Sequence, residues 1–188
     1  MVSLKCIAAI CDKGGIGFNN KLPWGFIKKD MNFFKKLTCG QPGSKNAVLM
    51  GTNTFFSIQK QLKNRDMFVL TRCPKTFFIR KHDIHKNTIS CSVFNNLDNI
   101  LSYSKEQNYD ELWCIGGEQI YDLSFKEWIF DDVFITYIHK YYECDTYLDI
   151  PDFYTEINRS YDTVDDISLS FHHFVPSYET LRNDMYLV

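Results

Sequence analysis

The sequence predicts an α/β fold, and three observations support this prediction. Short apolar runs alternate with stretches of helical periodicity along most of the chain, which is typical of a largely parallel sheet. An apolar run passes through glycine directly into a helical stretch near Gly51 and again at Gly116-Gly117. The 188 residues contain no internal repeat, low-complexity tract or linker. We therefore expect one domain over residues 1–188, with a twisted, mostly parallel eight-stranded sheet, an antiparallel C-terminal strand pair and about four flanking helices.

The expected strands are short apolar runs, which suit strands buried on both faces of a parallel sheet. In chain order they cover residues 4–11, 47–50, 67–72, 88–91, 111–115 and 132–138. Two further runs, near 153–160 and 168–175, are joined by the acidic loop 162–166 with no helix between them. Such a connection predicts antiparallel pairing at the edge of the sheet.

Helices are expected over residues 26–37, from Gly51 through Ile58, over 95–106 and over 118–123. Residues 73–87 are expected to form a loop of mixed charge instead. His82 and His85 lie in this loop with the spacing of half a metal site. No further cluster of metal-ligand residues joins them, so we expect no bound metal.

The first expected helix carries its one acid on its apolar side. On a helical wheel Asp30 falls together with Ile27, Met31, Phe34 and Leu37, opposite the lysines of the helix. Burying an unpaired carboxylate is costly, so Asp30 requires a ligand or a partner in the fold. The residues alone leave two roles open: a ligand-binding acid, or an acid at the rim of the stripe that pairs with a lysine or a backbone group.

Composition and charge argue against several classes of function. A net charge of −2 and an apolar content of 45% describe an ordinary globular protein and give no support to a nucleic-acid or anionic-membrane partner. The seven cysteines form no C-x-x-C pair, so we expect free thiols in a reducing compartment. The N-terminal segment lacks the features of a signal peptide and no run approaches membrane-spanning length. We therefore expect a cytoplasmic protein.

Glycine-containing turns supply the candidate phosphate sites. Gly51 is followed by Thr52 and Thr54, and Gly116-Gly117 precedes a helical stretch; backbone N–H groups at a helix start bind anions. Each feature also has an ordinary explanation, since Thr is a common N-cap and the spacing is not the G-x-G-x-x-G of dinucleotide sites. The glycine-rich loop 12–25 holds a Trp and is either a lid over a pocket or a plug in a small core.

Taken in order, the motifs resemble those of the dihydrofolate reductase family. They are Cys6-Ile-Ala-Ala-Ile10, Gly15-Ile-Gly-Phe-Asn-Asn-Lys-Leu-Pro-Trp24, Asp30 with Phe34, Val48-Leu-Met-Gly51, Thr54-Phe-x-Ser-Ile58, Leu62-Lys-Asn-Arg65, Leu70-Thr-Arg72, Trp113-Cys-Ile-Gly-Gly-Glu-Gln-Ile-Tyr121, Ile135-Thr136 and Cys144-Asp-Thr146. Each motif is weak alone, but together they follow the family order from residue 4 to about 148. The closing strand pair is compatible with the way the family ends.

The resemblance implies NADPH-dependent reduction of 7,8-dihydrofolate to 5,6,7,8-tetrahydrofolate, which supplies one-carbon metabolism and thymidylate synthesis. It also implies tight binding of antifolate inhibitors. Among the implied catalytic residues, Asp30 would hold the pterin, Thr136 would brace Asp30, and Leu22 and Trp24 would belong to the lid. Arg65, otherwise an arginine in a polar loop, would take the glutamate α-carboxylate. The remaining substrate contacts would be Ile7, Ala8, Met31, Phe34, Ile58, Leu62 and Ile115.

The cofactor contacts implied by the resemblance lie in the glycine-rich loop and after three strands. They are Ala9, Ile16, Gly17, Gly51, Thr52, Asn53, Thr54, Leu70, Thr71, Arg72, Ile115, Gly116, Gly117, Glu118, Gln119, Ile120 and Tyr121. Thr52 and Asn53 stand where family members usually carry basic residues, and Cys91 falls where another basic residue can help. Thr71 and Arg72 remain for the 2′-phosphate. We therefore expect a preference for NADPH over NADH that is smaller than in a relative with Lys or Arg at these positions.

Two other interpretations stay open for the sequence. A reductase of a ribosylated pyrimidine in riboflavin synthesis shares the sheet topology but gives no reason for Asp30 and Arg65 together. A catalytically inactive homologue, kept as a binding or structural protein, does not explain why Leu22, Trp24 and Gly116-Gly117 are intact. We expect a monomer, as in the family, either free-standing or as part of a bifunctional polypeptide with thymidylate synthase.

Overall fold

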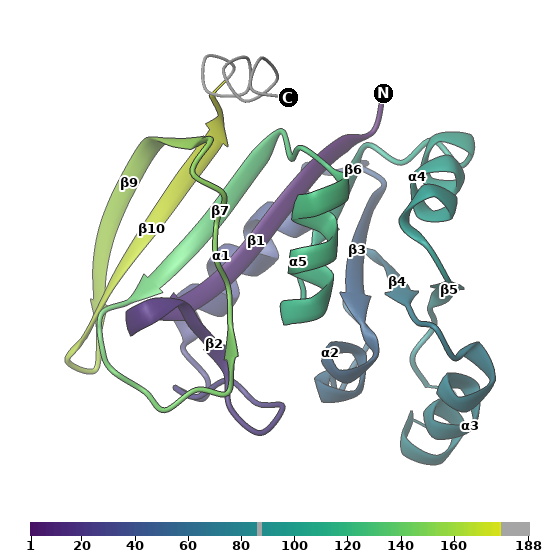
Figure 1. Ribbon diagram of the computed structural model, residues 1–188, viewed down its shortest axis with the longest axis horizontal. Helices are drawn as coiled ribbons and strands as arrows, with labels where there is room; N and C mark the ends of the chain where they lie inside the picture. The colour runs from purple at the N-terminus through teal and green to yellow at the C-terminus, as the bar shows by residue number, and fades with distance from the viewer. Residues whose placement is uncertain (86–87, 178–188) are drawn as a thin grey trace, which may run out of the picture.

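The computed structural model describes residues 1–85 and 88–177. Its main sheet has eight strands in the order β5-β4-β3-β6-β1-β7-β10-β9, as Figure 1 shows. These strands are β1 (Ser3–Cys11), β3 (Asn46–Gly51), β4 (Asp66–Leu70), β5 (Ser92–Phe94), β6 (Glu111–Cys114), β7 (Asp132–Ile138), β9 (Tyr154–Val164) and β10 (Ile167–Pro176). A second small sheet pairs β2 (Gly15–Gly17) with β8 (Thr146–Tyr147).

Strand direction confirms the predicted fold class. All pairs from β5 through β7 are parallel, whereas β10 is antiparallel to both β7 and β9. The carboxyl ends of the parallel strands therefore share one edge of the sheet, where ligands bind in open α/β folds. In Figure 1 the arrowheads of β3 and β4 point to this edge, toward α2 and α3.

The described residues form five α-helices, one more than expected. They are α1 (Lys28–Cys39), α2 (Thr52–Ser57), α3 (Pro74–His85), α4 (Leu97–Glu106) and α5 (Glu118–Glu127). A short 3-10 helix, Asp12–Gly14, follows β1. The additional helix is α3, and the prediction of a loop over 73–87 is wrong for its described part.

Local chemistry explains why α3 forms. Pro74 lies at the first helical position, where a missing N–H is harmless, and the Thr71 hydroxyl accepts a hydrogen bond from the Cys73 N–H at 3.2 Å. Phe77 is buried, with its ring 5.1 Å from that of Phe55. Other apolar residues of α3, such as Ile79, are exposed. The helix therefore lacks the apolar periodicity from which a helix is predicted.

The strand expected at 88–91 is also wrong. The fifth strand is Ser92–Phe94, paired with the end of β4, and Ile89 is buried in an irregular segment before it. His82 lies exposed on α3 beside Asp83, whereas the side chain of His85 is outside the described residues. No group of three or more His, Cys, Asp or Glu within reach of a common metal ion occurs in the described part of the chain.

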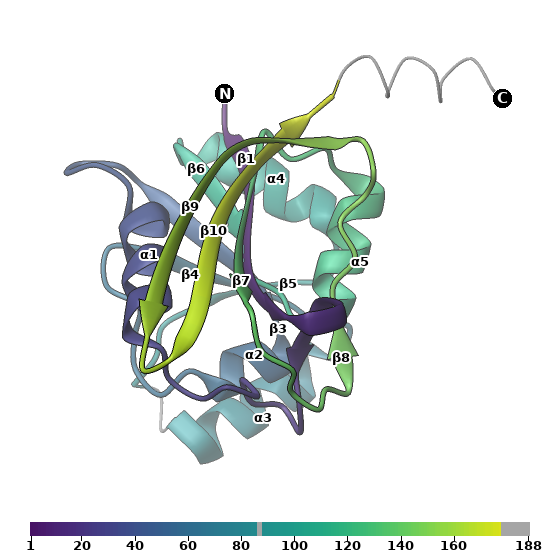
Figure 2. The ribbon, with the colours of Figure 1, turned by 90° about the vertical axis from the view of Figure 1, so that its left-hand side faces the viewer.

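Helices cover both faces of the sheet. Figure 1 shows α5 in front of the sheet and α1 behind it, and Figure 2 shows α1 on the opposite side from α4 and α5. Aromatic side chains of α1, α2 and α3 pack on one apolar cluster with Ile7, Met50 and Trp113. Side chains of α4 and α5 pack on the cluster of the other face. The sheet is therefore a two-sided core, consistent with its apolar strands.

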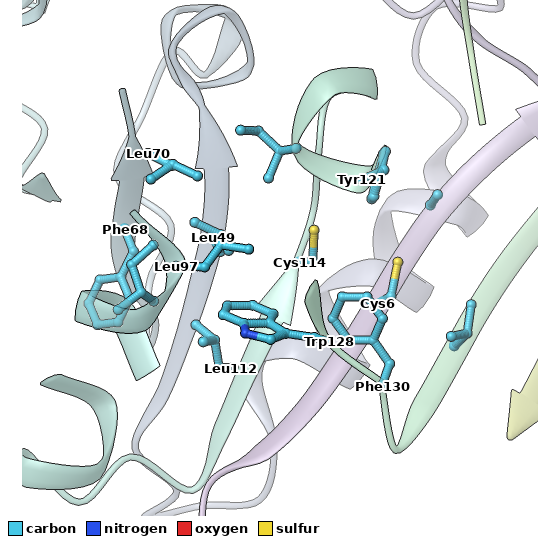
Figure 3. Packing of buried hydrophobic residues seen from close by; sticks show 14 of the residues in the cluster. Cys6, Leu49, Phe68, Leu70, Leu97, Leu112, Cys114, Tyr121, Trp128 and Phe130 are labelled. Atoms are coloured by element: carbon cyan, nitrogen blue, oxygen red, sulfur yellow. The ribbon is translucent and has the colours of Figure 1, made fainter. Parts of the chain in front are cut away.

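Figure 3 shows buried side chains of the cluster under α4 and α5. Cys6 of β1 and Cys114 of β6 are partners in the strand register and both are fully buried, with Phe68 and Trp128 in the same cluster. All seven cysteines are free thiols. Within residues 1–85 and 88–177, no helix is both long enough and apolar enough to cross a membrane.

Candidate active site

The buried acid on α1 is the centre of the candidate site. Asp30 lies in the first turn of α1, just after Ile27 in extended conformation, and its side chain is turned inward with 4% of the residue exposed. Thr136 of β7 hydrogen-bonds its carboxyl group. Burial raises the pKa of Asp30, and this hydrogen bond offsets the rise only in part. The carboxyl group therefore has spare hydrogen-bonding capacity inside the fold.

Apolar side chains form a cluster on the α1 side of the sheet, the side that carries Asp30. Ile7 of β1 is buried in the cluster beneath α1, and Met31 is half-buried on the helix. Half-buried side chains also pack against this cluster from α1, from the segment after α2 and from the end of β6: Phe34, Ile58, Leu62 and Ile115. Ala8 differs, because its side chain lies in the cluster of the opposite face. Any contact that Ala8 makes with a ligand near Asp30 is therefore a backbone contact.

Arg65 is held in a fixed orientation by the carboxyl end of α1. Its guanidinium group, on a residue only 7% exposed, donates from Nη1 to the Thr38 hydroxyl at 2.7 Å and from Nε to the Lys63 carbonyl at 3.1 Å. The Thr38 hydroxyl in turn donates to the Phe34 carbonyl at 2.7 Å. The guanidinium lies 5.5 Å from the Phe34 ring centroid. Two of the five N–H donors are thus used, and the others remain for an anion.

Thr38 is the one residue of this arrangement that the sequence reasoning missed. It is fully buried on α1, about two helical turns beyond Asp30. A polar residue that continues the face of Asp30 and Phe34 at four-residue spacing was the available indication. The contact with Arg65 spans 27 residues, so its purpose was not readable from sequence.

The glycine-rich loop 12–25 is anchored to the segment around β8. The Gly17 carbonyl accepts a hydrogen bond from the Asp145 N–H at 2.9 Å, and the Asp145 carboxylate accepts one from the Asn19 N–H at 2.8 Å. Trp24 is buried edge-to-face against Tyr142, at 6.0 Å between centroids, and its indole N–H has no partner among the described residues. Leu22 is 42% exposed. The loop therefore has a fixed base and one exposed apolar side chain.

The carboxyl ends of β3 and β6 meet through glycine. The Gly51 N–H donates to the Gly116 carbonyl at 2.8 Å, and the Gly116-Gly117 peptide is cis. Gly116 has φ +90°, and a Cβ there would lie 2.3 Å from the Tyr121 ring, so only glycine fits. The Tyr121 hydroxyl donates to the Ile7 carbonyl at 2.8 Å. This packing presents the first N–H groups of α5 at the ligand-binding edge.

Comparison with known proteins assigns this arrangement to a family. The family model described as dihydrofolate reductase matches residues 3–176. The chain belongs to the dihydrofolate reductase family. A dihydrofolate reductase of Drosophila melanogaster is 29% identical over 84% of this chain and 85% of its own length. The Gallus gallus enzyme is 31% identical over 80% and 82%, and the Schistosoma mansoni enzyme is 34% identical over 77% and 76%.

The residues that the family resemblance assigned to a cofactor lie mostly along one edge. Gly51 to Thr54 end or follow β3, Leu70 to Arg72 end or follow β4, and residues 115–121 follow β6. Ala9 and Ile16 are half-buried near the glycine-rich loop, and Gly17 packs so closely on Thr146 that a Cβ would lie 2.4 Å from its hydroxyl.

Three of the assigned residues have structural tasks. The Glu118 carboxylate accepts the Tyr147 N–H at 2.8 Å and so holds β8. Leu70 is buried in the core beneath α4, and Ile120 packs on Gly51. Gln119 is exposed. Direct ligand contact by Glu118 and Leu70 side chains is therefore less favoured than contact by the backbone around them.

Cys91 lies at the wrong end of its strand for the role given to it. It precedes β5, whereas Thr71 and Arg72 follow the carboxyl end of the neighbouring β4. The residues beyond the carboxyl end of β5 are Asn95 and Asn96, whereas the expected strand over 88–91 ends at Cys91. Asn96 is the N-cap of α4 and accepts the Asn99 N–H at 2.8 Å. The position beside Arg72 is thus uncharged, since neither Asn95 nor Asn96 carries a charge.

Proposed function

We propose that this chain reduces 7,8-dihydrofolate to 5,6,7,8-tetrahydrofolate with NADPH, adding a hydride to C6 and a proton to N5. The observation that carries the proposal is Asp30, a buried acid with spare hydrogen-bonding capacity in a chain of this family. When bound, NADPH supplies the hydride. The substrate's 2-amino group and neighbouring ring nitrogen supply the donors that Asp30 lacks in the fold.

Asp30 acts on the reaction through its charge and hydrogen bonds. An acid that holds the far side of the pterin ring cannot reach N5, so solvent delivers that proton. Thr136 keeps the carboxyl group in place from β7, which spares the site any reorganisation as charge develops on the ring. Leu22 and Trp24, on the loop anchored at Asp145, exclude water from the reacting atoms.

Arg65 binds the glutamate α-carboxylate of the substrate. The contacts with Thr38 and Lys63 fix the guanidinium, and its unused N–H groups suit a paired interaction with a carboxylate. The apolar middle of the proposed site is formed by residues of one cluster: Ile7, Phe34, Ile58 and Leu62. A ligand with a polar ring, an apolar middle and an anionic end satisfies all three parts.

The residues at the carboxyl edge fit a dinucleotide cofactor. Gly116 leaves no space for a side chain beside Tyr121, so the backbone itself faces the edge, and the start of α5 suits a pyrophosphate. Thr71 and Arg72 are the candidates for the 2′-phosphate. Thr52, Asn53 and Asn95 carry no charge, so the expected preference for NADPH over NADH remains smaller than in relatives with basic residues after Gly51.

One assay tests the proposed activity. The purified chain is mixed with NADPH and either dihydrofolate or a ribosylated pyrimidine, and NADPH absorbance is followed with and without a diaminopyrimidine antifolate. We expect turnover that the antifolate abolishes, because a protonated diamino ring pairs with a buried carboxylate better than the substrate does. Binding of NADPH without turnover would indicate the inactive homologue, and turnover only with a ribosylated pyrimidine would indicate the related reductase.

The cofactor preference is tested separately. The ratio of Kd for NADH to Kd for NADPH is measured for the wild type and for Asn53→Lys, whose side chain position is exposed. We expect the lysine to raise the ratio by roughly tenfold, the effect of one added charge contact of about 1.4 kcal/mol. An unchanged ratio would contradict the role given to this position.

The monomeric state, the cytoplasmic location and an association with thymidylate synthase stay predictions of family membership. Light scattering of the purified chain measures the first. The supply of tetrahydrofolate to one-carbon metabolism follows from the proposed reaction and is tested by complementation of a reductase-deficient strain.

A further inference from the structure

Two cysteines far apart in sequence meet at the base of the glycine-rich loop. The sulfur atoms of Cys11 and Cys144, 133 residues apart, lie 3.5 Å from each other. Cys11 ends β1 and is buried, whereas Cys144 is half-buried just before β8. Gly15 packs against both sulfur atoms, because a Cβ on it would lie 2.4 Å from the Cys144 sulfur and 3.0 Å from the Cys11 sulfur. The first strand, the loop and the segment before β8 therefore converge on these sulfurs.

The other close pair of thiols serves as a contrast. Cys6 and Cys114 are both fully buried in the core, out of reach of any reagent while the protein is folded. Cys144 is partly accessible, so one member of the Cys11–Cys144 pair can meet a reagent that arrives from solvent. A disulfide needs sulfur atoms at about 2.05 Å, so the sulfurs, now 3.5 Å apart, must approach by about 1.5 Å.

We propose that Cys11 and Cys144 form a reversible disulfide that fastens the glycine-rich loop 12–25, with a small-molecule disulfide such as oxidised glutathione as the oxidant. Burial and the neighbouring Cys11 raise the pKa of Cys144 to about 11, so its thiol first loses a proton to solvent. The resulting thiolate attacks one sulfur of the oxidant and releases a first thiolate. The Cys11 thiolate then attacks the Cys144 sulfur of the mixed disulfide and releases a second. The two protein thiols lose two protons and two electrons in total, and one disulfide becomes two thiols.

The bond would reinforce contacts that already hold the base of the loop. The Gly14 carbonyl accepts the Leu148 N–H at 2.9 Å, and the Gly17 carbonyl accepts the Asp145 N–H at 2.9 Å. A covalent link between Cys11 and Cys144 would join the end of β1 to the same segment. Because Leu22 and Trp24 lie on this loop, oxidation would restrict the movement of the lid. This consequence rests on the proposed function, whereas formation of the bond does not.

Formation of the bond is tested by mass spectrometry. The full chain is equilibrated with mixtures of reduced and oxidised glutathione, alkylated, digested and analysed. We expect a linked pair of peptides containing Cys11 and Cys144, a loss of two mass units per chain, and reversal by dithiothreitol. Cys144→Ser should lose the link, and Cys73→Ser, which removes an exposed thiol, should keep it. Stable glutathione on Cys144 without the link, or unreacted Cys144 under fully oxidising conditions, would overturn the proposal.

The effect on the lid is tested with the same samples. We expect oxidised protein to turn over dihydrofolate about three- to tenfold more slowly than reduced protein, with recovery on reduction, because lid motion limits many such reactions. Cys144→Ser should show equal rates in both buffers. Equal rates for wild-type protein that carries the bond would overturn the restriction of the lid. Absence of turnover in fully reduced protein would instead contradict the proposed function, and limited proteolysis within residues 12–25 would then report loop restriction directly.

Discussion

Two acids on the α1 side of the sheet have opposite surroundings. Glu111, at the start of β6, accepts hydrogen bonds from Asn46 Nδ2 at 2.7 Å and Trp113 Nε1 at 2.8 Å, and pairs with Lys5 Nζ at 2.8 Å. Asp30, at the other end of the same face, is more deeply buried and is hydrogen-bonded by Thr136. A buried charge with a structural role has its hydrogen-bond and ion-pair partners within the fold. An acid buried without a full set of partners is a candidate binding residue.

The pKa values follow the same division. The charges and hydrogen bonds of Glu111 and Asp132 raise the pKa of Lys5 against the opposing effect of burial, so that network favours its own charged form. Burial raises the pKa of Asp30, so the fold itself disfavours the charged form of this carboxyl group. The contrast predicts that changes at Asp30 affect catalysis and changes at Glu111 affect stability.

The largest expected effect is that of Asp30→Asn. Dihydrofolate turnover at neutral pH should fall by about 10²-fold or more, the size of effect that acid–base groups contribute, while the Kd for NADPH stays within about twofold. The free energy of unfolding should be unchanged or higher, since a poorly solvated charge is removed. Steady-state kinetics and fluorescence titration measure these quantities. A turnover equal to wild type would remove Asp30 from the mechanism.

Glu111→Ala should give the complementary result. Asn46, Trp113 and Lys5 lose an acceptor, and we expect the free energy of unfolding to fall by about 2 kcal/mol, with turnover by the folded protein close to wild type. Urea denaturation followed by tryptophan fluorescence measures the loss. Glu111→Gln is the matched control and should recover part of it. A variant that keeps its stability but loses turnover would abolish the distinction between the two acids.

Thr136→Val sharpens the comparison by leaving Asp30 without its partner. The hydrogen bond to the carboxyl group contributes about 1 kcal/mol, so kcat/KM should fall by roughly fivefold. The pKa of Asp30 should rise further, which the pH dependence of kcat/KM detects. Thr136→Ser keeps the hydroxyl and should resemble the wild type; equal losses in both variants would point to packing instead.

The smallest expected effects are two opposite slopes of stability against pH. The raised pKa of Asp30 means that the folded state binds more protons than the unfolded state. Stability of the ligand-free protein should therefore fall as pH rises from about 4 through the folded pKa. Burial lowers the pKa of His172, whose Nδ1 lies 3.0 Å from Glu156 and whose Nε2 lies 2.7 Å from Ser170. Here the unfolded state binds more protons, and stability should rise with pH below about 6.5.

Unfolding free energies measured across pH 4 to 8 separate these two groups. Asp30→Asn should remove the falling slope and leave the rising one. His172→Gln should do the reverse. If neither substitution changes the profile, the titration of these two groups does not control the stability in that range.

Sequence periodicity was sufficient for the features that depend on neighbouring residues. The alternation of apolar runs and helices predicted the parallel sheet, and the helical wheel predicted that Asp30 faces inward. It failed at α3, where a single buried Phe77 carries the packing, and at β5, where the buried Ile89 precedes the strand. The Thr38–Arg65 and Cys11–Cys144 contacts depend on chain segments that only the tertiary fold brings together. Such pairs leave no periodic pattern in the sequence.

The hydrogen bond between Thr38 and Arg65 attaches the Arg65 guanidinium to the same helix that carries Asp30. Asp30 and Thr38 are carried by the same rigid helix, about 12 Å apart along its axis, and Arg65 is fastened to the Thr38 end. A molecule that binds both Asp30 and Arg65 must span the distance that α1 sets between them. A stiff, extended molecule does so at the least entropic cost. A compact ring compound can bind to Asp30 but is too short to reach Arg65 as well. Under the proposed function, the helix therefore favours a ligand long enough to reach both charges over a shorter one that reaches only Asp30.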